Sequence, residues 1–180
     1  MGLGNVLSDQ GARAAGADSV RFLQAAEIAF REALVVYTKD HDPQHWIATS
    51  GNLAEALFLS SQFAKTRDQL AMLLDYQDLG PAEQVALRAI AIANSVALRT
   101  IARTESEFEQ ALSLLSRQGS DFFLTWDFSS IKTFIDKYSV FGNHRQWLLP
   151  LIETFQSGRR DEMLAAVQTA REVFRKTTKP

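Results

Sequence analysis

Residues 29–57 read AFREALVVYTKDHDPQHWIATSGNLAEAL, which contains two helical patterns separated by a short polar turn. In the turn, Asp42 can cap the second helix and Pro43 can occupy its first position, where the missing N–H of proline leaves no hydrogen bond unmade. The apolar residues of the first pattern recur at the i, i+4, i+7 and i+8 spacing of one helix face. These residues are Ala26, Phe30, Ala33 and Leu34. The pattern predicts a helical hairpin.

Glycine and proline divide the rest of the chain in the same way. Gly80-Pro81 ends one helical pattern and begins the next, and single glycines follow others. Strand signals are almost absent, so the sequence predicts an all-α fold. The predicted helices cover residues 2–10, 19–39, 43–61, 63–77, 81–103, 105–118, 128–139, 143–157 and 160–176. Because connections of about 2 to 8 residues force neighbouring helices to run antiparallel, we expect stacked antiparallel hairpins.

Composition limits the classes of function. A chain of 180 residues that is 46% hydrophobic can bury the core of one domain. Its net charge of −2 gives no general attraction for nucleic acid or anionic lipid, so neither partner is expected. The absence of cysteine excludes disulfides and thiolate chemistry and fits a reducing compartment. The most apolar segment, AIAIANSVAL, is too short to span a membrane, and we expect a cytoplasmic protein.

A pattern of leucine, small residue and leucine occurs twice. It appears in GLGNVL at 2–7 and in GNLAEAL at 51–57, with 50 residues from Leu3 to Leu53. A small residue between two leucines lets a partner helix approach closely. The partner helix supplies small, aromatic and small residues at i, i+4 and i+7, which are Ala26, Phe30 and Ala33. The two segments therefore predict equivalent helix pairs.

This pairing resembles the tetratricopeptide repeat, in particular its long bacterial variety, in which a helix like FREAL, a turn like DHDPQHW and a helix like NLAEAL follow one another. The unit of that family is about 34 residues. The excess length here is attributed to an inserted GARAAGAD loop and to extra helical turns around Asp42-Pro43. Residues 2–60 carry the resemblance, which implies an α-solenoid of stacked hairpins over residues 1–118.

The last third of the chain is rich in aromatic residues and shows no repeat. We expect residues 119–180 to form a helical cap that covers the apolar end of the solenoid, within one domain over 1–180. Aromatic side chains gather at Phe122, Phe123, Trp126, Phe128, Phe134, Tyr138, Phe141 and Trp147. The chain also begins inside a repeat, which suggests that it is the C-terminal part of a larger protein or a short product of one.

The resemblance implies binding of a protein or peptide in a groove lined by the first helix of each hairpin. Carried over by position, the groove residues are Asn5, Ser8, Asp9, Ala48, Gly51, Glu55, Phe58, Leu59, Asn94 and Arg99. Family members that clamp a C-terminal carboxylate use Lys, Asn and Arg at these places. Asn5 fits this set, but Glu55 would repel a carboxylate, so we do not expect such a clamp. Glu55, Phe58 and Leu59 are expected to be more exposed than core residues such as Leu53.

No pattern in the sequence predicts catalysis, a metal or a cofactor. His41 and His45 flank Pro43, which resets the backbone between them, so they do not form the i, i+4 pair of a zinc helix. His144 is interpreted as a residue at the start of a helix. No Ser-His-Asp spacing is recognisable, and no glycine-rich loop follows a strand. We therefore expect a scaffold or sensor region rather than an enzyme.

Two alternatives remain open. The first is a small-ligand receptor or an enzyme with its site among the aromatic hairpins, because aromatic walls with a few polar groups are typical of ligand pockets. That site would lie around Trp126, Asp127, Tyr138, His144 and Trp147. The second concerns the basic residues near the C-terminus, which we interpret as a solvated face interleaved with carboxylates. They would otherwise form a patch for an acidic peptide.

Overall fold

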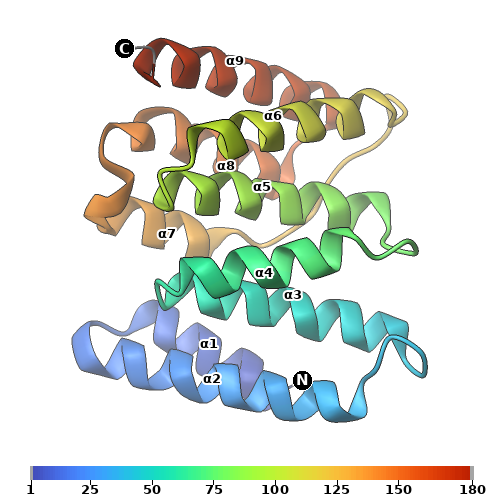
Figure 1. Cartoon of the computed structure of the whole chain (residues 1–180), viewed down its shortest axis with the longest axis vertical. Helices are drawn as coiled ribbons and strands as arrows, with labels where there is room; N and C mark the ends of the chain where they lie inside the picture. The colour runs from blue at the N-terminus through green and yellow to red at the C-terminus, as the bar shows by residue number, and fades with distance from the viewer. Residues whose placement is uncertain (1, 179–180) are drawn as a thin grey trace. The chain divides into compact units, whose positions relative to one another are not determined.

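The structure is a computed structural model that describes residues 2–178. Within this range the regular elements are helices, and the one β-type contact is an isolated bridge between Phe123 and Arg159. Figure 1 shows the helices as coiled ribbons, most of them joined by short connections. The prediction of an all-α fold is confirmed. None of the helices in the described range is long and apolar enough to cross a bilayer.

The chain divides into two compact units, Met1–Leu79 and Gly80–Pro180. The first unit contains two helical hairpins. Its helices are α1 (Gly2–Arg13), α2 (Gly16–Val36), α3 (Pro43–Leu59) and α4 (Phe63–Leu74). Asp42 accepts a hydrogen bond from the backbone N–H of His45 at 3.2 Å, and Pro43 begins α3. The predicted N-cap and first residue of α3 are confirmed.

The core of the first unit lies between α2 and α3. Ala26 and Phe30 of α2 pack against Leu53 and Leu57 of α3, and all four are buried. Gly4 of α1 faces the same ring, since a Cβ built on it would lie 2.5 Å from Phe30 Cε1. The glycine thus permits the close approach of α1 that the sequence predicted.

The second unit joins one hairpin to the aromatic C-terminal helices. Its elements are α5 (Pro81–Ala97), α6 (Ile101–Ser116), α7 (Ser129–Lys137), the 3₁₀ helix η1 (Ser139–His144), α8 (Arg145–Ser157) and α9 (Arg160–Thr178). The rings of Phe108, Trp147 and Phe174 meet where α6, α8 and α9 pack together. Trp147 is buried and Trp126 is partly buried.

A long connection crosses the second unit between α6 and α7 (Figure 1). Its backbone is held to the turn between α8 and α9, because Leu124 N–H donates to Gly158 O at 3.1 Å and Arg160 N–H donates to Phe122 O at 2.8 Å. We expected a division after residue 118. The structure groups α5 and α6 with the C-terminal helices instead, since α6 packs directly on α9.

The hairpins α3–α4 and α5–α6 have the same construction. The first helix of each has 17 residues and begins with a proline, and 38 residues separate Pro43 from Pro81. Two residues after the end of each first helix comes a residue with positive φ, Ser61 at 59° and Arg99 at 55°. This spacing differs from the 50-residue spacing that the leucines of the first two hairpins predicted.

The turns of these two hairpins close with the same hydrogen bonds. The N–H of the residue after the positive φ reaches back five residues, from Gln62 to Leu57 O at 2.9 Å and from Thr100 to Ser95 O at 3.1 Å. Such a bond satisfies a carbonyl at the end of the first helix. A threonine in the first turn of each second helix also donates its side-chain hydroxyl to the backbone carbonyl four residues earlier. The distances are 3.1 Å from Thr66 to Gln62 O and 3.0 Å from Thr104 to Thr100 O.

The turn at Arg99 also corrects one predicted boundary. A single helix was expected over 81–103, but α5 ends at Ala97 and α6 begins at Ile101. A positive φ is uncommon in residues other than glycine, so the sequence carries no turn signal at Arg99.

Candidate functional site

The first helices of the first two hairpins meet through two asparagines. The side-chain amide of Asn52 in α3 donates to the side-chain oxygen of Asn5 in α1 at 2.9 Å. Asn5 is exposed and Asn52 is partly buried, so polar groups of both amides face solvent. A carboxamide has both donors and acceptors and can pair with the backbone of an extended peptide. We call the surface formed by Asn5, Ser8, Asp9, Asn52 and Glu55 the α1–α3 face.

The candidate groove residues fall into two groups by exposure. Those with accessible surface include Asn5, Asp9 and Arg99, which are exposed, and Ser8, Ala48 and Glu55, which are partly buried. The remaining residues, Gly51, Phe58, Leu59 and Asn94, are buried. Of the predicted set, Asn5 makes a hydrogen bond to Asn52, which the sequence analysis did not select.

The expected exposure of Phe58 and Leu59 is wrong. Their exposed fractions are 0% and 4%, so both are buried like Leu53, which is 1% exposed. The reason is that α3 packs against both α2 and α4, so more than one of its faces is covered. The ring of Phe58 contacts that of Phe63 at the start of α4, with centroids 5.7 Å apart. Only Glu55 of the three fits the expectation of a more exposed residue.

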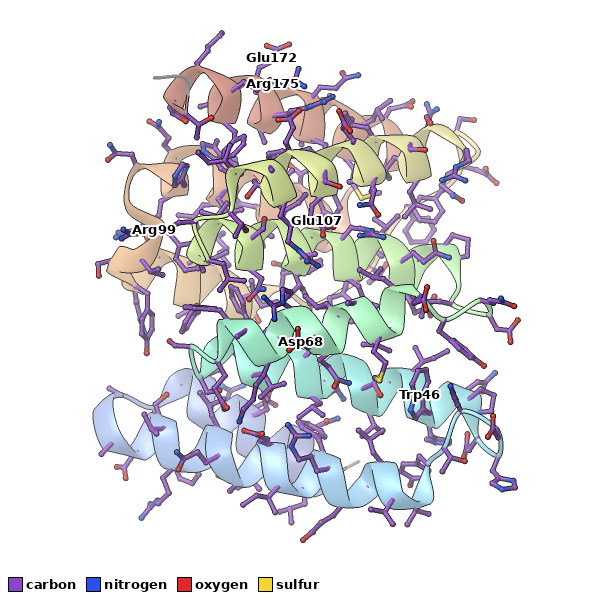
Figure 2. The ribbon with its side chains drawn as sticks, viewed as in Figure 1. Trp46, Asp68, Arg99, Glu107, Glu172 and Arg175 are labelled. Atoms are coloured by element: carbon purple, nitrogen blue, oxygen red, sulfur yellow. The ribbon has the colours of Figure 1, made fainter. Side chains whose placement is uncertain are left out.

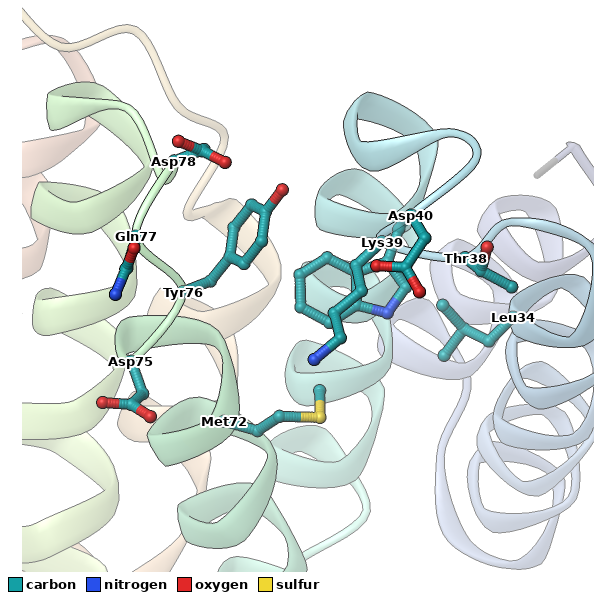
Figure 3. Close-up of a pocket in the computed structure, with 10 residues that line it drawn as sticks. Leu34, Thr38, Lys39, Asp40, Met72, Asp75, Tyr76, Gln77 and Asp78 are labelled. Atoms are coloured by element: carbon teal, nitrogen blue, oxygen red, sulfur yellow. The ribbon is translucent and has the colours of Figure 1, made fainter.

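A pocket of about 600 Å³ lies at the other end of the first unit (Figure 3). Its walls come from the end of α2, the α2–α3 turn, the start of α3 and the residues that follow α4. We call it the Tyr76 pocket. The Tyr76 ring meets that of Trp46 edge-on, with centroids 5.1 Å apart. Pockets of this size with aromatic walls are typical of ligand or side-chain binding.

The lining of the Tyr76 pocket is acidic. It carries the carboxylates of Asp40, Asp75 and Asp78 against the single amine of Lys39, and Figure 3 shows Asp75 and Asp78 on the opposite side from Asp40. Burial raises the pKa of Tyr76, and the charges of Asp78 and Asp40 raise it further, so the phenol keeps its proton at neutral pH. An aromatic, acidic pocket favours a cationic group over an anionic one.

The residues of the proposed aromatic site have different ring partners. The ring of His144 contacts that of Trp147, with centroids 5.7 Å apart, whereas Tyr138 stacks on Phe134 and Trp126 contacts Phe128. Asp127 accepts hydrogen bonds from the N–H and hydroxyl of Ser129 at 2.9 and 2.6 Å, which lower its pKa. Asp127 therefore pairs with Ser129 at the start of α7, one residue before the N-cap position, which Phe128 occupies.

The histidines near Pro43 lie at a polar corner. His41 is exposed, and the His45 ring contacts both carboxylate oxygens of Asp42 at 2.9 and 2.8 Å. These contacts, with the side-chain hydrogen bond largest, lower the pKa of Asp42. Over residues 2–178 no three side chains of His, Asp or Glu are arranged as a metal site.

The basic C-terminal residues are partly paired. Arg171 and Arg175 of α9 both donate to Glu105 of α6, and Arg171 also reaches Glu109 at 2.7 Å. Burial raises the pKa of Glu105, but the two arginines outweigh it, and the pKa lies below its ordinary value. This helix face therefore joins α6 to α9 inside the second unit.

Comparisons with known proteins give no relative. The chain matches no protein-family model, no curated protein and no solved structure. The resemblance to the tetratricopeptide repeat therefore rests on the residues and hairpins described above and stays a prediction.

Proposed function

We propose that the chain is a non-catalytic interaction module that binds an extended segment of a partner protein on its α1–α3 face. The observation that carries this proposal is the meeting of Asn5 and Asn52, which sets amide donors and acceptors from two successive hairpins on one surface. An extended peptide exposes unpaired backbone N–H and C=O groups, and side-chain amides can pair with both.

The shared construction of α3–α4 and α5–α6 supports a repeat protein of the tetratricopeptide kind. Repeated hairpins present the first helix of each unit in series, which creates an extended binding surface from short elements. In this proposal the chain is a scaffold or a sensor region that recognises a partner segment.

The Tyr76 pocket gives the module a preference for basic partners. Its three carboxylates and two aromatic rings suit the side chain of lysine or arginine, through charge attraction and contact with a ring face. A partner segment with a basic residue would then bind the first unit more tightly than a neutral one.

The test begins with a random peptide library displayed on phage and selected on the complete chain. The dissociation constants of the selected peptides are measured by fluorescence polarisation for the unmodified chain and for Asn5→Ala/Asn52→Ala. Because hydrogen bonds at a partly exposed site contribute about 1 kcal/mol each, the double variant should bind about thirtyfold more weakly.

The matched control is Gln24→Ala/Gln168→Ala, which removes two exposed side-chain amides outside the α1–α3 face. Its affinity should equal that of the unmodified chain. Equal affinities for all three proteins would show that the selected peptides bind elsewhere and would reject the proposal.

A further inference from the structure

A second pocket, of about 580 Å³, lies in the second unit where the α5–α6 turn meets η1 and the end of α9. We call it the Arg99 pocket. Arg99 and Thr100 contribute from the turn, His144 from the end of η1, and Phe174 from α9. Figure 2 shows Arg99 at the end of α5, on the side of the unit where this turn lies. The volume falls in the range of pockets that hold small molecules.

The ionisable side chains that line the Arg99 pocket are both basic. They are Arg99 and His144, and none of the lining residues in the described range is Asp or Glu. Arg99 is exposed, and no carboxylate of the described residues lies within ion-pair distance of it. The charge of the guanidinium is thus available to a ligand of opposite sign.

The other hairpin shows that the turn does not need this guanidinium. Ser61 occupies the place of Arg99 in the α3–α4 turn and takes the same positive φ, and both turns close with the same backbone hydrogen bonds. The residue four positions before the positive φ also differs. It is Leu57 in the α3–α4 hairpin, whereas in the α5–α6 hairpin it is Ser95, which lines the Arg99 pocket. Arginine at this position is therefore additional to what the backbone requires.

The backbone acceptors at the pocket are already used. Ser95 O accepts hydrogen bonds from the N–H and the hydroxyl of Thr100, both at 3.1 Å. Phe174 O accepts from the hydroxyls of Thr177 and Thr178 at 2.9 and 2.8 Å. These two carbonyls, near the ends of α5 and α9, are therefore paired within the chain itself.

Unpaired polar groups remain at the pocket. The first turn of α6 has no side-chain cap and no acidic residue, although Thr100, Ile101 and Thr104 line the pocket. His144 Nδ1 is buried and has no hydrogen-bond partner within residues 2–178. The start of a helix carries a partial positive charge that favours an anion and adds to the charge of Arg99.

We propose that the Arg99 pocket binds a small organic carboxylate. The carboxylate would pair with Arg99 and lie near the start of α6, and its hydrocarbon part would contact Phe141 and Phe174. Planar guanidinium groups bind carboxylates through two parallel hydrogen bonds. This site lies in the second unit and goes beyond the proposed binding of a partner segment on the α1–α3 face.

The test uses phenylacetate and hexanoate as probes, with phenylacetamide and inorganic phosphate as comparisons. Each is titrated into the complete ¹⁵N-labelled chain, and dissociation constants are taken from amide shifts of residues 95–104. At least one of the two carboxylates should bind saturably, and phenylacetamide and phosphate should bind about tenfold or more weakly than the better carboxylate.

The variant Arg99→Ser copies Ser61 and so preserves the turn. It should weaken the binding of the carboxylate by about tenfold or more without lowering the thermal midpoint of unfolding. The control Arg117→Ser removes an exposed arginine from the end of α6 and should bind as the unmodified chain does. Absence of saturable binding by both carboxylates up to about 20 mM would overturn the proposal. So would equal binding of phenylacetamide or phosphate, or an unchanged affinity in Arg99→Ser.

Discussion

Arg88 of α5 donates to a carboxylate oxygen of Glu107 of α6 at 2.7 Å, and the Glu107 side chain is only 4% exposed. Figure 2 shows Glu107 between the two helices. The α3–α4 hairpin has a neutral contact at the equivalent place, where Gln69 donates to Ser50 O at 3.4 Å. The same position between paired helices thus carries an ion pair in one hairpin and an amide contact in the other.

This comparison predicts the effect of breaking the ion pair. Arg88→Ala leaves a buried carboxylate with only the more distant Arg103 as a cationic partner, so it should lower the free energy of unfolding by about 3 kcal/mol or more. The double variant Arg88→Ser/Glu107→Gln copies Ser50 and Gln69 and should recover most of that loss. Urea denaturation measures both, and a double variant as unstable as Arg88→Ala would contradict the equivalence of the two hairpins.

Close approach of α1 to Phe30 predicts opposite effects for two glycines. Gly4→Ala would place a Cβ 2.5 Å from the Phe30 ring and should destabilise the chain by about 1–3 kcal/mol. Gly51→Ala, inside α3, meets nothing within 4 Å and should stabilise it by about 0.5–1 kcal/mol through helix propensity. Thermal unfolding measures both changes, and a stable Gly4→Ala variant would show that α1 is not held against α2.

Removing the Phe30 side chain tests the core of the first unit. The residue is 1% exposed, so Phe30→Ala should cost about 3–5 kcal/mol through lost burial and the cavity left behind. Val35, which is 79% exposed on the same helix, provides the control, and Val35→Ala should change the stability by less than about 0.5 kcal/mol. A loss below about 1 kcal/mol for Phe30→Ala in urea denaturation would contradict the packing described here.

His144 should make stability depend on pH. Burial lowers its pKa below the ordinary 6.5, so in the acid range the unfolded chain binds a proton more readily than the folded chain does. The stabilising contribution is complete above about pH 6.5 and is lost as the pH falls below that value. The carboxylates with lowered pKa, among them Glu27 and Glu105, change the stability only below about pH 4.5, so they do not affect the comparison for His144.

The measurement is the thermal midpoint at about pH 7.5 and pH 5.5. The midpoint of the unmodified chain should fall more between these values than that of His144→Gln, which cannot take up the proton. An equal fall in both proteins would show that His144 does not contribute.

The elements that local sequence determines were predicted well. Asp42 and Pro43 start α3 as expected, because a cap acts through neighbouring backbone groups. The faces of α2 and α3 that bear Phe30 and Leu53 were also predicted, since helical periodicity alone assigns them to the core.

The features that depend on contacts between distant residues were not predicted. Asn52 appears in the sequence as an ordinary polar helix residue, and its partner Asn5 lies 47 positions away. The equivalence of α3–α4 and α5–α6 was missed because it consists mainly of backbone hydrogen bonds, and the two hairpins share few side chains. Phe58 was assigned to an open face, because periodicity does not reveal that two helices cover α3.

Selection of peptides should also reveal the charge of the Tyr76 pocket. Peptides selected on the complete chain should be enriched in Lys and Arg, and Asp75→Asn/Asp78→Asn should weaken their binding by a few fold and reduce its dependence on salt. The control Asp161→Asn/Glu162→Gln removes two exposed charges from the other unit and should have no effect on affinity. Enrichment in Asp and Glu would contradict a preference for basic partners.

The most direct test of the proposed function is the footprint of a selected peptide on the complete ¹⁵N-labelled chain. Binding on the α1–α3 face predicts that the largest shifts fall on the side-chain amides of Asn5 and Asn52 and on the backbone of Ser8 and Glu55, with the signals of α9 unchanged. Shifts confined to Gly80–Thr178, with Asn5 and Asn52 unmoved at saturation, would contradict it.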